Sequence, residues 1–366
     1  MTGMTMSGRP SWARKLTTIS LVIALVALVF TVRDIGLGTL FHYLRRIGWW
    51  WLAVIPLEVV TTTLDASAIR CFASPDKVRL RSTLLSQLAG RAVNAVTPGG
   101  NLGEVVKMSV LTESVSESRA VATILLYNVV TFSVELLVVA VAAFPLAMLV
   151  PMPHGLRTLL LISGVLCFVV SIGLYVLVRR GMVVSVARLA SRIHIGKRYL
   201  LSQERFDRWL PKLQGVDDKM RLVAGARTRD RWLGIGLCTV SRLNSIFLSL
   251  LILHAVGEAM TVQFIAAYTV GQFVIYMVAS LVPMGLGISE GGYDGLFRAL
   301  GENPARGVTL AFARRTVTIV YAAVGLVLVT TSETVKRARV RGKAPAPLPP
   351  AVAVRASGQL ATEDAD

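Results

Sequence analysis

Long apolar segments separated by short polar stretches recur along almost the whole chain. The segments that the pattern predicts to cross a membrane are residues 16–32, about 50–69, 121–149, about 156–178, 232–256, 262–282 and about 308–330. Roughly 20 apolar residues in a helix span the hydrocarbon core of a bilayer. Because only helices and closed barrels satisfy the backbone inside lipid, the pattern predicts an all-α polytopic transmembrane helical bundle.

Proline and glycine interrupt two further apolar runs, one in each half of the chain. The first run, residues 84–111, is broken at residues 97–104, and the second is broken at residues 283–292 and followed by a short helix to Leu300. A pair of interrupted segments in the two halves points to a central site in a membrane transporter. We therefore expect 7–8 spans and two broken or re-entrant segments.

Basic residues near the span ends predict the orientation of the bundle. They favour a cytoplasmic N-terminal arm (residues 1–15), a cytoplasmic loop at 70–81, a cytoplasmic linker at 179–231 and a cytoplasmic tail. Seven full spans would leave the tail outside, against its charge. An eighth crossing, made by the segment after Met284, would restore agreement, and the sequence alone leaves both counts open.

The composition supports a membrane protein and excludes most soluble classes. The chain is 54% hydrophobic and 16% charged, with a formal net charge of +18. The linker at 179–231 holds 14 Lys and Arg residues against 5 Asp and Glu residues. This basic excess beside the spans is typical of contact with an anionic lipid surface, so we predict no nucleic-acid partner. Apolar residues among its charges favour surface-lying amphipathic helices. We assign residues 16–332 to the membrane domain and 333–366 to a disordered tail.

Charged residues inside the predicted membrane segments are the candidate chemistry. Glu58 and Asp65 lie seven residues apart, on one face of a helix. Charges at the bilayer centre cost about 2.5–3.5 kcal/mol each on insertion scales, so they should face the bundle interior. Arg314 and Arg315 are either functional or neutralising partners for the carboxylates of the bundle, and the sequence leaves both roles open.

The first break has both a functional and a structural interpretation. A broken helix exposes the N–H groups and the positive dipole end of the half-helix that follows, which suits a phosphate or carboxylate. Arg91 and Lys107 would add positive charge on either side. Alternatively, Asn101 and Glu104 form a capping box at a simple turn.

Cysteine and histidine provide no sign of a metal or redox site. The three cysteines and four histidines are scattered along the chain without metal-ligand spacing. We therefore expect no metal and no cofactor.

The two breaks carry a family resemblance. The pattern N-x-x-x-P-G-G-x-x-G-E-x-x-K, from Asn94 to Lys107, resembles the first hallmark of the lysylphosphatidylglycerol synthase transmembrane-region, or flippase-like domain, family. The pattern P-x-G-x-G-x-x-E, from Pro283 to Glu290, resembles its second hallmark, and Arg314 its last span. Two departures are Lys107, where the family usually has Arg, and Met284, where it more often has Gly.

The resemblance implies a stand-alone membrane domain that binds or moves lipids, since the chain ends too soon after the last span for an aminoacyl-transferase domain. We hypothesise a non-enzymatic, multi-pass protein of the cell membrane that translocates a phospholipid or polyprenyl-linked lipid with an anionic head group. The alternative is a non-catalytic membrane subunit that supports a separately encoded lipid glycosyl- or acyl-transferase. The predicted substrate-binding residues are Asn94, Pro98, Gly99, Gly100, Gly103, Glu104, Lys107, Glu290 and Arg314.

Overall fold

The computed structural model describes the chain in several stretches. These are residues 38, 45–97, 101–151, 153–179, 194–195, 198–199, 208–211, 214–215, 217–218, 228–282 and 285–341. The predicted first span, most of the basic linker, the end of the tail and the tips of both breaks (98–100 and 283–284) lie outside them. The chain divides into two units, Met1–Leu326 and Val327–Asp366.

Helices build the first unit, as the apolar pattern predicts. Their bounds, after a short 3-10 turn η1 (Gly48–Trp50), are α3 (Trp51–Phe72), α4 (Leu80–Val96), α5 (Asn101–Leu111), α6 (Glu117–Leu149), α7 (His154–Arg179), α10 (Thr228–Ala255), α11 (Val262–Ala279), α12 (Ile288–Ala299) and α13 (Pro304–Arg341). Within the linker, β1 (His194–Ile195) pairs antiparallel with β2 (Arg198–Tyr199). The described part of the second unit continues α13 to Arg341.

The all-α membrane bundle is confirmed. Six stretches of the described residues are long and apolar enough to cross a membrane: Arg45–Phe72, Glu117–Leu149, His154–Val176, Thr228–Ala255, Val262–Ala279 and Pro304–Gly325. They correspond to six of the seven predicted spans, and the seventh, residues 16–32, lies outside the described chain. At 12 residues, α12 is about 18 Å long and too short to cross alone.

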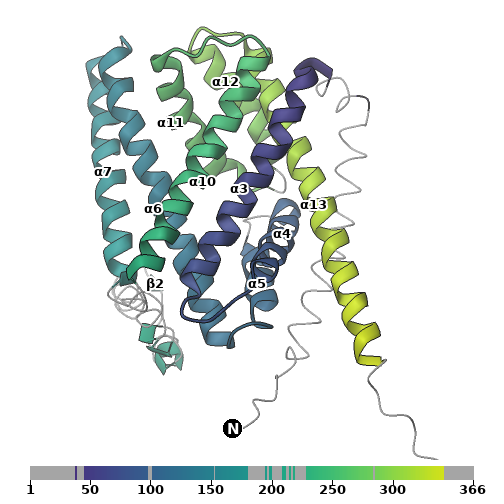
Figure 1. Ribbon diagram of the computed structural model, residues 1–366. Coiled ribbons are helices and arrows are strands. Elements are labelled where there is room, and N and C mark those ends of the chain that lie inside the picture. The colour runs from purple at the N-terminus through teal and green to yellow at the C-terminus, as the bar shows by residue number, and fades with distance from the viewer. Residues whose placement is uncertain are drawn as a thin grey trace, which may run out of the picture. The chain divides into compact units, whose positions relative to one another are not determined.

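Contacts between helix ends define the two ends of the bundle. At one end, which we call the linker end, Ser74 donates a hydrogen bond to Asp230 at 2.5 Å and joins the end of α3 to the start of α10. At the opposite end, the rings of Trp50 and His254 lie 5.8 Å apart and join the start of α3 to the end of α10. Helices α3 and α10 are therefore antiparallel neighbours along their whole length (Figure 1).

Each of the two interrupted runs folds as a helical hairpin, and the hairpins enter from opposite ends. Helices α4 and α5 start and finish at the linker end, where Ser82 and Ser114 share a hydrogen bond of 2.8 Å. Helices α11 and α12 start and finish at the opposite end, where the rings of Phe264 and Phe297 lie 5.7 Å apart (Figure 1). Because α12 returns the chain to that end, α13 runs back toward the linker end. The predicted orientation of the tail requires such a return, and the orientation itself stays a prediction.

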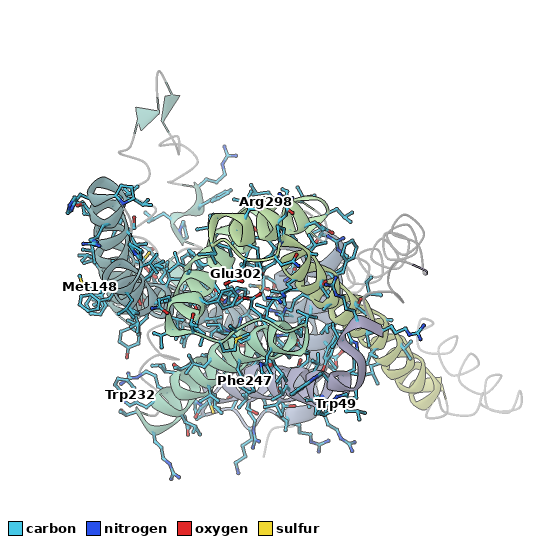
Figure 2. All side chains as sticks on the ribbon, turned by 90° about the horizontal axis from the view of Figure 1, so that it is seen from above. Trp49, Met148, Trp232, Phe247, Arg298 and Glu302 are labelled. Carbon is cyan, nitrogen blue, oxygen red and sulfur yellow. The ribbon has the colours of Figure 1, made fainter. Side chains whose placement is uncertain are left out.

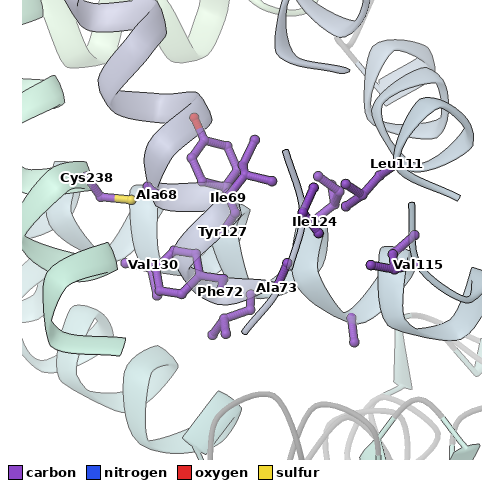
Figure 3. Close-up of a cluster of buried hydrophobic side chains, with 14 of the residues drawn as sticks. Ala68, Ile69, Phe72, Ala73, Leu111, Val115, Ile124, Tyr127, Val130 and Cys238 are labelled. Carbon is purple, nitrogen blue, oxygen red and sulfur yellow. The ribbon is translucent and has the colours of Figure 1, made fainter. Parts of the chain in front are cut away.

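Two apolar clusters occupy the two ends of the bundle. The cluster at the linker end includes Ile69, Phe72, Leu111, Ile124 and Tyr127 (Figure 3). The cluster at the opposite end includes the fully buried side chains Leu248, Ile252, Leu253, Tyr268 and Phe297. Helix α3 contributes Val54 to one cluster and Ala68 to the other. Its two acidic residues therefore lie between the clusters, at the middle depth of the bundle.

The outer surface of the bundle is apolar, as lipid contact requires. Met148 of α6 and Phe247 of α10 are 52% and 54% exposed, and Figure 2 shows Met148 at the edge of the bundle. Helix α7 is the most exposed of the candidate spans, and only 11% of its most apolar window is buried. It packs along α6, which places it outside the layer of helices that carry the charges.

Candidate functional site

Six charged side chains from five helices meet between the two apolar clusters. We call this set the charged layer: Glu58 and Asp65 from α3, Arg91 from α4, Glu135 from α6, Arg242 from α10 and Arg314 from α13. Three arginines thus meet three carboxylates. Charges at this depth are stable only when they pair or face water, and the pairing observed here satisfies that requirement.

Asp65 is the most buried member of the charged layer and the most heavily bonded. Its carboxylate forms ion pairs with Arg91 at 3.2 Å and Arg242 at 3.0 Å. It also accepts hydrogen bonds from Gln87 at 3.1 Å and Ser241 at 2.6 Å, and its side chain is 1% exposed. Asp65 therefore fixes α4 and α10 against α3, which is a structural role.

The end of the charged layer at Arg314 is held more weakly. Arg314 Nη1 lies 3.6 Å from Glu58, and its Nη2 donates to Ser245 Oγ at 3.3 Å. Glu58 is meanwhile held by Arg91 at 2.7 Å, so it would keep a partner if Arg314 moved. The Arg314 side chain is 34% exposed, the largest value among the arginines of the layer. Among the three arginines of the charged layer, Arg314 thus has the most exposed side chain and the longest ion pair.

The first hairpin is closed by a separate set of contacts. Glu104 accepts hydrogen bonds from Asn94 at 3.0 Å, Asn128 at 2.7 Å and Lys107 at 2.8 Å. Asn94 in turn accepts from the backbone N–H of Gly103 at 2.7 Å, so α4 and the start of α5 are clamped together. Asn94, Gly103, Glu104 and Lys107 are thus one cluster. We call it the hairpin clamp.

Glycine is required where the two helices of this hairpin touch. A Cβ on Gly103 would overlap Asn94 Oδ1 and the carbonyl oxygen of Gly90. A Cβ on Gly90 would overlap the stem of Lys107. This close approach brings the Lys107 ammonium 5.4 Å from the centre of the Tyr127 ring, where the ring face is attractive to a cation.

The second hairpin is fixed by Arg315 of α13. Arg315 forms an ion pair with Glu290 of α12 and lies 3.5 Å from the carbonyl oxygen of Gly285 in the break. Its side chain is only 4% exposed. These contacts show which carboxylate each of the two adjacent arginines meets, and a functional role for either stays a prediction. Arg315 neutralises Glu290, whereas Arg314 faces the charged layer and Glu58.

Part of the charged layer is exposed to solvent. Arg91, Arg242, Glu135 and Glu104 keep between 18% and 26% of their side-chain surface exposed, although they lie at the middle of the bundle. Tyr276 of α11 is 60% exposed, and α11 packs against α6, the helix that carries Glu135. Together these exposures indicate a solvent-accessible region at these four charged residues, on the side of α6 against which α11 packs.

The structure places the predicted residues that it describes in three groups. Asn94, Gly103, Glu104 and Lys107 form the hairpin clamp, Glu290 lies with Arg315, and Arg314 lies in the charged layer. Pro98, Gly99 and Gly100 lie outside the described residues. Whether any of the predicted residues binds a ligand stays a prediction.

Sequence reasoning gave too little weight to Arg91, Glu135 and Arg242, which are central to the charged layer. The signal that could have found them is their charge within apolar segments, because an ionisable residue at membrane depth marks a site by default. Their pairing across helices far apart in the chain could not be read from the sequence.

The comparisons agree with the architecture. The family model described as "Lysylphosphatidylglycerol synthase TM region" matches residues 17–325, which is most of the chain. No curated protein and no solved structure was found to match the chain.

Proposed function

Because the chain belongs to the lysylphosphatidylglycerol synthase TM region family, we propose that it binds the anionic head group of a lipid beside the charged layer and moves it across the bilayer. The single observation that carries this proposal is Arg314, a cation at the middle depth of a membrane bundle that is a third exposed and loosely paired. Arginine suits phosphate recognition because its planar guanidinium donates two hydrogen bonds at once.

Binding at Arg314 leaves the other charges paired. A phosphate that approaches Arg314 competes with a 3.6 Å contact to Glu58, and Glu58 retains its 2.7 Å bond to Arg91. The acyl chains of the lipid stay in the surrounding hydrocarbon while the head group occupies the polar region. This division of the lipid avoids the several kcal/mol that an unpaired charge would cost in the membrane interior.

The proposed role is not enzymatic, and its setting is the cell membrane. Each carboxylate of the charged layer is engaged by an arginine, so none can take a proton from a substrate without first losing an ion pair. Basic residues at the linker end, including Lys77, Arg79 and Arg81, favour a cytoplasmic location for that end.

A lipid-translocation assay tests the proposal. Wild-type protein is reconstituted in liposomes that contain a fluorescent anionic phospholipid. An impermeant quencher is added outside, and the rate at which the fluorescence of inner-leaflet lipid is lost reports translocation. We expect the Arg314→Met variant to translocate at least about tenfold more slowly, which corresponds to about 1.4 kcal/mol of lost head-group interaction. Arg298→Met is the matched control, since Arg298 is 68% exposed and pairs with Asp294 within α12. Equal rates for wild type and Arg314→Met would overturn the assignment.

A further inference from the structure

The chain order of the first unit repeats itself. Helix α3, the hairpin α4–α5 and the long helix α6 are followed, after α7 and the linker, by helix α10, the hairpin α11–α12 and the long helix α13. The short helices match in length: α4 and α11 have 17 and 18 residues, and α5 and α12 have 11 and 12. The two series run in opposite directions, because α3 and α10 are antiparallel and the hairpins enter from opposite ends (Figure 1).

Equivalent residues occupy equivalent positions in the two series. Asp65 is the fifteenth residue of α3 and Arg242 is the fifteenth of α10, and the two form an ion pair at 3.0 Å. Contact between equivalent positions is what a two-fold axis produces. The axis therefore passes near the Asp65–Arg242 pair, in the charged layer.

The hairpins show the same correspondence away from the axis. Glu104, near the start of α5, bonds Asn128, the twelfth residue of α6. Glu290, near the start of α12, bonds Arg315, the twelfth residue of α13. In the first repeat the cation that pairs with the glutamate is Lys107, three residues after Glu104. The position three residues after Glu290 in the second repeat holds Tyr293.

The contacts between the two repeats are also reciprocal. Helix α11 of the second repeat packs on α6 of the first, where the Phe132 and Phe273 rings lie 6.5 Å apart. Reciprocally, α4 of the first repeat packs on α13 of the second, where a Cβ on Gly325 would lie 3.3 Å from the Cβ of Ala92. Each hairpin thus rests on the long helix of the other repeat.

The two hairpins differ in how they are held to the charged layer. Arg91, seven residues before Pro98, ties α4 to Glu58 and Asp65. The residue seven before Pro283 is Tyr276, which lacks a positive charge and is 60% exposed. The hairpin α11–α12 therefore lacks, at this position, the ion pairs by which Arg91 holds α4 to the charged layer.

We propose that residues 51–149 and 228–326 are two inverted repeats, and that their hairpins open the charged layer to opposite sides of the membrane in turn. The hairpin α11–α12 moves against α6, and α4–α5 moves against α13, while the Asp65–Arg242 contact between α3 and α10 stays fixed. This inference rests on the proposed function for its cargo, but the motion is a property of the fold. Inverted repeats of this kind alternate by rocking around a central site.

A distance measurement tests the motion without any transport assay. Spin labels are placed on Phe132→Cys and Phe273→Cys in a chain whose three native cysteines are replaced by alanine, and the protein is reconstituted in lipid nanodiscs. We expect two populated distances between α6 and α11, with proportions that change with the lipid supplied. The control pair Phe144→Cys and Leu159→Cys lies on exposed sites of α6 and α7 and should give one distance. A single unchanging distance for the α6–α11 pair would refute the alternation.

Cross-linking connects the motion to transport. A short thiol cross-link between Phe132→Cys and Phe273→Cys should slow lipid translocation at least about tenfold and be reversed by reduction. A cross-link between Ala143→Cys and Gly164→Cys, whose Cβ atoms would lie 3.2 Å apart across α6 and α7, should leave the rate unchanged. Full transport in the cross-linked α6–α11 variant also refutes the alternation. If wild type itself moves no lipid while two distances are seen, the proposed cargo is wrong and the repeat motion stands.

Discussion

Arg314 and Arg315 are neighbours on α13 but have different environments, so residue type alone does not predict which of the two charges is buried and closely paired. Arg315 is 4% exposed and bonded to Glu290, whereas Arg314 is 34% exposed and loosely bonded to Glu58. Successive residues on a helix point about 100° apart, so adjacent charges contact different neighbours. The same principle separates Asp65, which is saturated with partners, from Glu135, which bonds Arg242 and remains 23% exposed.

Loss of the Asp65 charge should destabilise the bundle. In Asp65→Asn, Arg91 and Arg242 lose their shared carboxylate at a 1% exposed position, and breaking a buried ion pair in this way costs about 3–5 kcal/mol. We expect a clear fall in the thermal unfolding midpoint in detergent, followed by intrinsic fluorescence. Asp294→Asn, which removes an exposed pair on α12, serves as the control and should leave the midpoint unchanged.

Glu258, in the turn before α11, should make stability depend on pH. Burial raises the pKa of its carboxyl group above the usual 4.5, and repulsion from Glu302 adds to this effect, while the hydrogen bond from Arg306 opposes it. A carboxyl group whose pKa is raised by folding stabilises the folded state below its unfolded pKa, and that contribution is lost as the pH rises through the folded pKa.

The measurement compares wild type with Glu258→Gln, whose side chain cannot ionise. We expect the wild-type unfolding midpoint to rise relative to the variant as the pH is lowered from 8 toward about 4.5, the usual value. A difference between the two midpoints that does not change with pH would contradict the prediction.

At the scale of elements, the two helical hairpins distinguish this bundle from one that is built of simple spans. Proline and glycine interrupt apolar runs that would otherwise form single helices, and each run instead folds back on itself. The sequence predicted both interruptions, because these residues are strong local signals. It did not predict the hairpin clamp, in which Asn94, Lys107 and Asn128 converge on Glu104. Asn128 lies on a different helix, and only packing brings it there.

A methyl group at the helix contact should open the first hairpin. In Gly103→Ala the added Cβ overlaps Asn94 and the Gly90 carbonyl oxygen, so the clamp cannot close. Overpacking of this kind costs about 1–3 kcal/mol, and we expect a matching fall in the unfolding midpoint and slower lipid translocation. Gly295→Ala in α12 is the matched control, because a Cβ there meets no atom within 4 Å and alanine favours a helix. Similar midpoints for the two variants would be evidence against the clamp.

At the scale of the whole molecule, the number of crossings follows from where the hairpins turn back. Helix α11 is long enough to cross, but α12 brings the chain back to the end at which α11 starts, and α4–α5 returns in the same way. Within the described chain, α3, α6, α7, α10 and α13 therefore account for the net passages from one end to the other. With the predicted first span, residues 16–32, the number of complete crossings becomes even. An even number allows the basic N-terminal arm, linker and tail to share one side, as the distribution of charge predicts.

Single-cysteine labelling tests this topology. In intact cells an impermeant thiol reagent should label cysteines placed in the turns at 153–155 and 257–258. It should not label cysteines placed in the linker or after residue 341 unless the membrane is opened. Labelling of the tail in intact cells would show that α12 does not return the chain as described. Labelling in intact cells of a cysteine added to the N-terminal arm would instead show that the predicted first span is wrong.

The amino-acid sequence by itself determined the membrane class, the approximate helix bounds and the two breaks. These features are local: apolar length sets a span, and proline and glycine interrupt it wherever they stand. Only the tertiary structure decided which charges meet, because partners such as Asp65 and Arg242 lie far apart in the chain and pair through helix packing. Helix packing also decided to which end of the bundle the second hairpin returns the chain. A sequence records where a helix breaks, but the side to which the chain returns depends on the helices that it packs against.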